Sequence, residues 1–224
     1  MISITEMDES LERISTVIGK NVFSDVNKVY ISGIVAEKPY LYYTTEKSRF
    51  YRTEVHVQRN SGTVDCISIV FHDEKLKQFK VEKGMAIEVA GQFRSHLLKN
   101  SYYNCKKTDL FVFAQFLCPI KNISRLNKNF IYLEGAVSKR PNFRITPNGI
   151  RITDVSIAVN RIGDKKDFVP LIVWEDLAYM SSELNIGDKI KIFGRIQSRY
   201  YQKNLSDDEI AMIEVIEISV FEFC

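Results

Sequence analysis

Val29-Tyr-Ile-Ser-Gly-Ile-Val35 and Ile131-Tyr-Leu-Glu-Gly-Ala-Val137 carry the same pattern, and their glycines lie 102 positions apart. The same offset relates Pro39 to Pro141 and Arg59 to Arg161. One added residue then raises the offset to 103, which pairs Phe71 with Trp174, Asp73 with Asp176, Gly84 with Gly187, Gly91 with Gly194 and Ser95 with Ser198. A period of this length is too long for a solenoid and indicates a duplicated domain. We therefore expect an N-terminal extension over residues 1–26 and two domains over residues 27–119 and 120–224.

Both copies show the same order of predicted elements. In the first copy, alternating apolar and polar residues predict strands over residues 29–35, 52–59, 64–71, 86–94 and 109–117. The second copy repeats them over residues 131–137, 152–161, 168–174, 189–197 and 210–221. A short amphipathic segment lies between the third and fourth strands, with Leu177, Met180 and Leu184 on one face of it in the second copy. An all-β protein of two tandem five-stranded OB-fold barrels, each with this short helix, fits the pattern.

A further helix is expected ahead of the repeat. Thr5-Glu-Met-Asp8 resembles a capping box, and Met7, Leu11, Ile14 and Ile18 follow at helical spacing before Gly19. We expect this helix to pack on the first barrel or on another subunit.

The charge is unevenly distributed, although the whole chain carries only +3. Residues 27–108 and residues 122–203 each hold 14 Lys and Arg against 8 Asp and Glu, and both ends of the chain are acidic. Two equally basic blocks favour a polyanionic partner such as a nucleic acid.

Other classes of protein are disfavoured by the sequence. No apolar run reaches the length of a membrane span, and acidic residues occupy the place of a signal peptide, so we expect a cytoplasmic protein. The cysteines form no C-x-x-C pair and have no histidines at metal spacing, so neither a metal nor another cofactor is expected; they are Cys66, Cys105, Cys118 and Cys224.

The second copy resembles the bacterial single-stranded DNA-binding protein family. The resemblance spans residues 129–221 and rests on Asn129-Phe-Ile-Tyr-Leu-Glu-Gly135, Pro147-Asn-Gly149, Ile157-Ala-Val-Asn-Arg161, Trp174-Glu-Asp-Leu-Ala178 and Gly187-Asp-Lys-Ile through Gly194-Arg-Ile-Gln-Ser-Arg199. It implies an OB barrel that binds single-stranded DNA in replication, recombination and repair, wrapped over four barrels. This chain is similar to the members with two barrels, which form homodimers. It ends at Cys224 directly after the fifth strand, so we expect it to lack the family's acidic, partner-recruiting C-terminal tip.

The resemblance also implies binding residues, because single strands are bound by aromatic rings that stack on bases and by cations that contact phosphates. In the second copy the matching aromatics are Phe143, Phe168, Trp174, Tyr200 and Tyr201. The cations beside them are Arg144, Arg161, Arg195, Arg199 and Lys203. The first copy offers Tyr42, Arg59, Phe71, Arg94, Tyr102 and Tyr103. Asp65 stands there for Phe168 and His96 for Arg199, so we predict that the two barrels bind unequally.

Several alternatives stay open at this point. An aromatic residue in a strand is also typical of core packing, which applies to Phe71, Phe168 and Trp174. The Tyr40–Tyr43 cluster is also compatible with a subunit contact. Some OB-fold proteins are nucleases, but the acidic pairs here open helical segments, where capping explains them, and we expect no enzyme. The alternative function is an adaptor of a primosome-type or RNA-binding complex that binds strands weakly.

Overall fold

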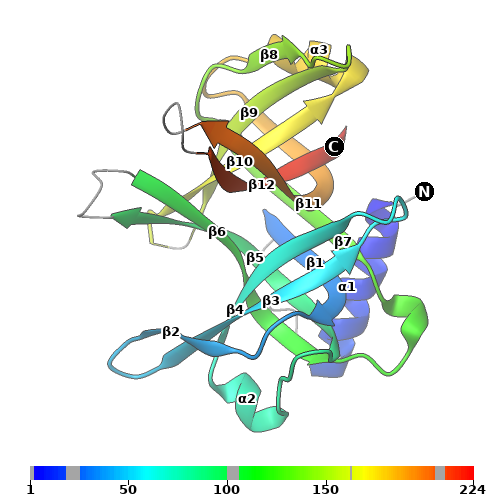
Figure 1. Ribbon diagram of the computed structural model, residues 1–224, viewed down its shortest axis with the longest axis vertical. Coiled ribbons are helices and arrows are strands. Elements are labelled where there is room, and N and C mark those ends of the chain that lie inside the picture. Colours follow the sequence, from blue (N-terminus) through cyan, green and yellow to red (C-terminus); the bar gives the residue numbers. More distant parts are fainter. Residues whose placement is uncertain (1–2, 19–25, 100–105, 162, 205–209) are drawn as a thin grey trace.

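The computed structural model describes residues 3–18, 26–99, 106–161, 163–204 and 210–224 (Figure 1). The described chain is mostly strands, as predicted. It begins with helix α1 (Ile4–Ile18). The first half then contains β1 (Asn27–Val35), β2 (Tyr40–Thr44), β3 (Arg49–Gln58), β4 (Val64–His72), α2 (Glu74–Gln78), β5 (Ala86–Lys99) and β6 (Lys106–Pro119).

The second half repeats this order after a short 3-10 turn, η1 (Ile123–Arg125). Its elements are β7 (Asn129–Val137), β8 (Asn142–Ile145), β9 (Arg151–Asn160), β10 (Lys166–Trp174), α3 (Glu175–Ser182), β11 (Lys189–Asn204) and β12 (Ile210–Phe223). Two features differ from the prediction. Short strands, β2 and β8, form where no strand was predicted, and the fourth and fifth strands of each half extend into longer ribbons.

The pairings within each half run in a closed circuit. In the first half, β1 pairs with β3 and β5, β3 pairs with β4, β5 pairs with β6, and β4 joins β6 in parallel. The second half closes in the same order through β7, β9, β10, β12 and β11. Because side chains alternate along a strand, each circuit has an inner face that packs the core and an outer face.

Sharp bending of the fourth strand depends on glycine. Gly91 and Gly194 lie at bulges in the ladders β5–β6 and β11–β12. A Cβ atom on Gly91 would stand 2.0 Å from the carbonyl oxygen of Phe113, and one on Gly194 would stand 2.3 Å from that of Ser219. No other residue fits so close an approach of two backbones.

The two halves are joined by their first strands. β1 and β7 pair antiparallel, and Val29 faces Ile131, its own counterpart in the repeat. An antiparallel pair of equivalent strands centred on equivalent residues relates the halves by a local twofold axis. The duplication is therefore built as a symmetric pair within one chain.

Helix α1 covers the outer side of this junction (Figure 1). Its residues Met7, Leu11 and Ile14 are buried in a cluster with Tyr30 from β1 and Phe130 from β7. The expected apolar stripe is thus confirmed for these three residues, whereas the side chain of Ile18 lies outside the described part. The helix packs on both halves, not on the first alone.

The predicted cap of α1 is wrong by two positions. The helix begins at Ile4, and the Oγ of Ser3 accepts a hydrogen bond from the Glu6 N–H at 3.3 Å. Ser3 therefore has the place of the N-cap, and Thr5 lies inside the first turn.

Candidate nucleic-acid interface

The outer face of β10 presents two aromatic residues of the second half. Alternation along the strand buries Val169, Leu171 and Val173 and turns Phe168 and Trp174 outward. The Phe168 side chain is 51% exposed, which is unusual for a large apolar ring in a strand. Trp174 is half-buried, and its indole Nε1 donates a hydrogen bond to Ser219 Oγ at 3.1 Å. The two residues are six steps apart along the strand, so their Cα atoms are roughly 20 Å apart.

Cationic side chains of β11 and β8 belong to the same half. Arg199 donates from Nε to Glu217 at 2.8 Å, and its side chain is 41% exposed. The guanidinium of Arg195 lies 5.8 Å from the ring centre of Phe221, and burial, followed by the charge of Arg59, lowers its pKa. On β8, Arg144 pairs with Asp154, with 2.7 Å between Nε and Oδ2.

The remaining predicted residues of the second half are placed less completely. Phe143 is 38% exposed on β8, and Tyr200 is 56% exposed with its hydroxyl 3.2 Å from Glu214. Tyr201 and Lys203 lie in β11, but their side chains fall outside the described part of the structure. Lys166, which was not predicted, opens β10 on the same side of the strand as Phe168 and is exposed.

Three predicted arginines lie where the two halves meet. Arg59 donates to the buried carboxylate of Asp65, with 2.8 Å between Nε and Oδ2. Arg94 and Arg161 both reach the buried carboxylate of Asp167, at 3.0 Å and 3.4 Å. Arg59 therefore neutralises Asp65, whereas Arg94 and Arg161 share the single charge of Asp167; the sequence did not predict these pairs.

The two aspartates also make reciprocal contacts between the halves. The Ser198 N–H donates to Asp65 at 3.0 Å, and the Ser95 N–H donates to Asp167 at 2.7 Å. The Oγ of each serine in turn accepts a backbone N–H, from Cys66 and from Phe168 respectively, at 2.8 Å. These hydrogen bonds join β5 of the first half to β10 of the second, and β11 of the second half to β4 of the first.

This symmetry corrects the alignment of the two copies. Val57 faces Asp65 in the first half and Val159 faces Asp167 in the second, so the offset is still 102 along β4 and β10. Asp65 is therefore the counterpart of Asp167, and Cys66 is the counterpart of Phe168. The extra residue of the second copy falls after Trp174, within the segment that contains α3.

The corrected alignment also changes the prediction for Phe71. Its counterpart is Val173, and His72 is the counterpart of Trp174. Phe71 is fully buried in the core, so its ring is not available for stacking, and the predicted role is wrong. The core alternative holds for Phe71 but not for the exposed ring of Phe168.

An aromatic cluster lies around His72 on the outer face of the first half. Tyr43 stacks on Phe50, with ring centres 4.4 Å apart, and Phe50 contacts both His72 and Phe113 at 5.3 Å and 6.0 Å. Tyr43 is 40% exposed. Phe50 and Phe113 were not predicted, because only the register of β3, β4 and β6 brings them beside His72.

Tyr42 is engaged by polar side chains at both its hydroxyl and its ring. Its hydroxyl donates to Asp109 at 2.5 Å, and the guanidinium of Arg52 lies 5.1 Å from its ring centre. Burial, followed by Asp109, raises the pKa of Tyr42 to about 12. Tyr102 and Tyr103 lie outside the described residues.

The β3–β4 strands also bring three potential metal ligands together. Glu54, His56 and Cys66 each offer one ligand atom, and these atoms lie within 4.8 Å of one another.

No described helix is long and apolar enough to cross a bilayer.

Exposed aromatic rings beside arginines on a mostly-strand fold are the features that proteins use to bind single-stranded nucleic acids. Comparisons with known proteins find relatives that carry such a fold. Residues 128–221 match the model of the single-strand binding protein family. The second half of the chain is therefore similar to that family, and the resemblance found in the sequence is confirmed.

Individual relatives point the same way. The single-stranded DNA-binding protein of Thermus aquaticus is 28% identical over 134 residues, which cover 52% of this chain and 50% of that protein. Single-stranded DNA-binding protein 2 of Listeria monocytogenes is 31% identical over 99 residues, covering 41% of this chain and 61% of that protein. The chain thus spans about half the length of several curated relatives that it matches.

Solved structures agree in fold. The crystal structure of the wild-type single-stranded DNA binding protein from Thermus aquaticus aligns with a TM-score of 0.68 and 21% identity. The alignment covers 88% of this chain and 91% of that one, so the likeness includes both halves.

Proposed function

We propose that this chain binds single-stranded DNA without strong sequence preference and without catalysing a reaction. The observation that carries the proposal is the ring of Phe168, half-exposed on the outer face of β10 in the half that matches the single-strand binding protein family model. A base that stacks on this ring removes its exposed apolar surface from water, which stabilises the complex.

Each half is proposed to be an OB-type barrel with its own part of the binding face. The closed circuits of strand pairing, each with a short helix after its third main strand, support this architecture and the boundaries 27–119 and 120–224. Following the family, we also propose a cytoplasmic homodimer that presents four barrels and acts in replication, recombination and repair.

The two halves are proposed to contribute differently. In the second half, Phe168 and Trp174 stack on bases while Arg199, Arg144 and Lys166 contact phosphates. In the first half the stacked pair of Tyr43 and Phe50 takes the place assigned to Phe71, because that pair is on the outer face. Arg59 stays paired with Asp65, whereas Arg94 and Arg161 share one carboxylate, and the net positive charge of that group attracts phosphate.

Replacing Phe168 by Ala tests the proposal at its central residue. Since one base stack contributes about 1–3 kcal/mol, we expect F168A to bind a labelled oligo-dT roughly 5- to 150-fold more weakly. Fluorescence anisotropy of the labelled strand measures this change.

The matched control is Tyr179→Ala, because Tyr179 is 64% exposed on α3 and is not among the residues proposed to contact DNA. Y179A should bind as the unaltered chain does. Equal affinity of F168A and Y179A would contradict the proposed face, and an affinity too weak to measure in the unaltered chain would favour the adaptor function.

A further inference from the structure

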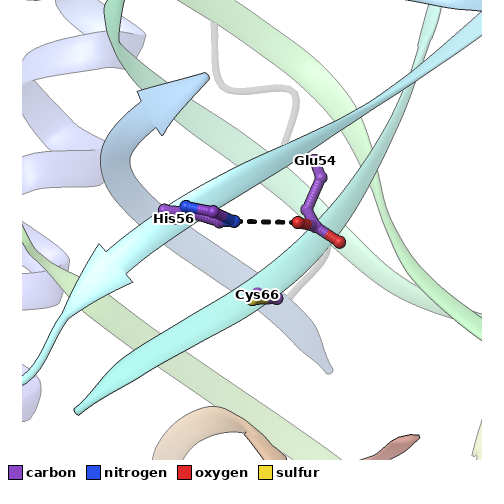
Figure 2. A group of neighbouring side chains, drawn as sticks. All are labelled: Glu54, His56 and Cys66. Atoms are coloured by element: carbon purple, nitrogen blue, oxygen red, sulfur yellow. Dashed lines mark hydrogen bonds and ion pairs between the residues drawn. The ribbon is translucent and has the colours of Figure 1, made fainter. Parts of the chain in front are cut away.

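Three side chains with different donor atoms converge on the outer face of the first half (Figure 2). In the β3–β4 ladder His56 faces Cys66, and Glu54 lies two residues before His56. Residues opposite each other, and residues two apart, point to the same side of a sheet. This register explains why an imidazole, a thiol and a carboxylate meet although 12 positions of sequence separate Glu54 from Cys66.

The ligand atoms are close enough to share one ion. All three lie within 4.8 Å of one another, and His56 Nε2 is 2.9 Å from Glu54 Oε1. The side chains of His56 and Glu54 are 43% and 33% exposed, so the group is open to solvent on one side. An ion could therefore enter without any rearrangement of the strands.

The electrostatic surroundings favour a cation. The carboxylates of Glu54 and Glu214 both lie close enough to the Cys66 sulfur to act on it by their charge. Glu214 belongs to β12 of the second half and accepts the hydroxyl of Tyr200. The site therefore combines carboxylates of both halves around one sulfur atom.

The second half builds the same pair of strands without these donors. The residues equivalent to Glu54, His56 and Cys66 are Ser156, Ala158 and Phe168. Neither the ladder nor the core therefore requires a carboxylate, an imidazole and a thiol at these places. The donor set is a property of the first half alone and goes beyond the proposed function.

We propose that Glu54, His56 and Cys66 form a zinc site on the outer face of the first half. Nitrogen, sulfur and carboxylate oxygen are the donors that Zn²⁺ takes, whereas a thiolate disfavours Mg²⁺ and Ca²⁺. On binding, the thiol releases its proton to solvent, His56 gives up its contact with Glu54, and Nε2 coordinates as neutral imidazole. Three protein ligands leave the fourth tetrahedral position to a water molecule.

Cobalt(II) absorption tests the site without any DNA, so its outcome is independent of the proposed function. The full chain, freed of metal with a chelator and kept reduced, is titrated with Co²⁺. We expect one equivalent to produce the near-ultraviolet band of a thiolate–cobalt bond together with visible bands of tetrahedral intensity. Added Zn²⁺ should remove both.

Variants assign the signal to its ligands. Cys66→Ser should abolish the thiolate band, and His56→Ala and Glu54→Gln should each weaken Co²⁺ binding by about tenfold or more. The control variants are C118S, C224S and C105S, which keep a thiol at Cys66 and should retain the full spectrum. Circular dichroism checks that each variant is folded.

Two results would overturn the proposal. One is a chain that gives no thiolate–cobalt band at stoichiometric Co²⁺. The other is a band that persists in C66S or is unchanged in both H56A and E54Q, because the ion would then be held elsewhere.

Discussion

Asp167 is fully buried and accepts hydrogen bonds from the Ser95 N–H and from Arg94. Losing the charge of a buried, paired carboxylate leaves its cations without compensation, which typically costs about 3–5 kcal/mol. We therefore expect Asp167→Asn to lower the free energy of unfolding by about that amount, measured by urea denaturation.

The control for this substitution is Asp176→Asn. Asp176 also pairs with an arginine, Arg151, but its side chain is 94% exposed. Exposed pairs contribute little to stability, so D176N should unfold almost as the unaltered chain does. Similar stability of D167N and D176N would show that the junction does not depend on the buried charge.

The placement of single aromatics shows where sequence reasoning succeeds and fails. The family resemblance placed Phe168 and Trp174 in one strand, and the structure turns both to its outer side. Phe71 was assigned wrongly because the inserted residue of the repeat was placed before β4 and not after it. A slip of one residue moves a side chain from the outer face of a strand to the core, so a small error in alignment reverses the predicted role.

Helix α1 is fixed to the strands by a charged contact as well as by its apolar stripe. Arg13 donates from Nη1 to Glu88 of β5 at 3.2 Å, and the Tyr30 hydroxyl donates to the same carboxylate at 2.9 Å. Burial alone would raise the pKa of Glu88, but the hydrogen bonds from Arg13, Tyr30 and Cys118 outweigh it and leave that pKa lowered. The ionised form of Glu88 therefore stabilises the docked helix.

A pH dependence follows from the direction of this shift. Because the folded pKa of Glu88 lies below its ordinary value, its contribution is complete at neutral pH. It is lost as the pH falls from about 5 through the folded pKa. The difference in unfolding free energy between the unaltered chain and Glu88→Gln should therefore shrink toward pH 3, as measured by urea denaturation across pH.

Glu12→Gln is the matched control, because Glu12 is an exposed residue of the same helix. Its effect on stability should stay small at every pH. A gap between E88Q and the unaltered chain that is constant from pH 7 to pH 3 would contradict the assignment of Glu88.

The helices and main strands were easier to predict from the sequence than the pairing between strands. Period-two patterning gave the main strands, and helical spacing gave α1 with its buried face. The short strands β2 and β8 form by pairing with β3 and β9. All five residues of β2, Tyr40–Thr44, are exposed or half-exposed, so the sequence lacks the alternating apolar pattern that would predict a strand there. The Glu54, His56 and Cys66 group was missed for the same reason, since its ligands meet only through the register of β3 and β4.

The whole molecule combines a symmetric frame with two different faces. Val29 opposite Ile131 and the reciprocal contacts of Asp65 and Asp167 repeat each other about one twofold axis. Duplication explains this frame; the repeat in the sequence predicted two copies of one domain but not their twofold arrangement. The outer faces differ at equivalent places, where the first half has Cys66 and His72 and the second has Phe168 and Trp174.

Binding of a single strand to this surface is the central claim, and Trp174, the one tryptophan of the chain, reports on it directly. The measurement is quenching of its fluorescence by oligo-dT of increasing length at low and high salt, with duplex DNA as competitor. We predict quenching that saturates at a defined length and is not reversed by duplex. With about 0.7 per phosphate contact, three contacts give a slope of log K against log salt of about −2. Absence of quenching at low salt, or equal competition by duplex, would contradict the account.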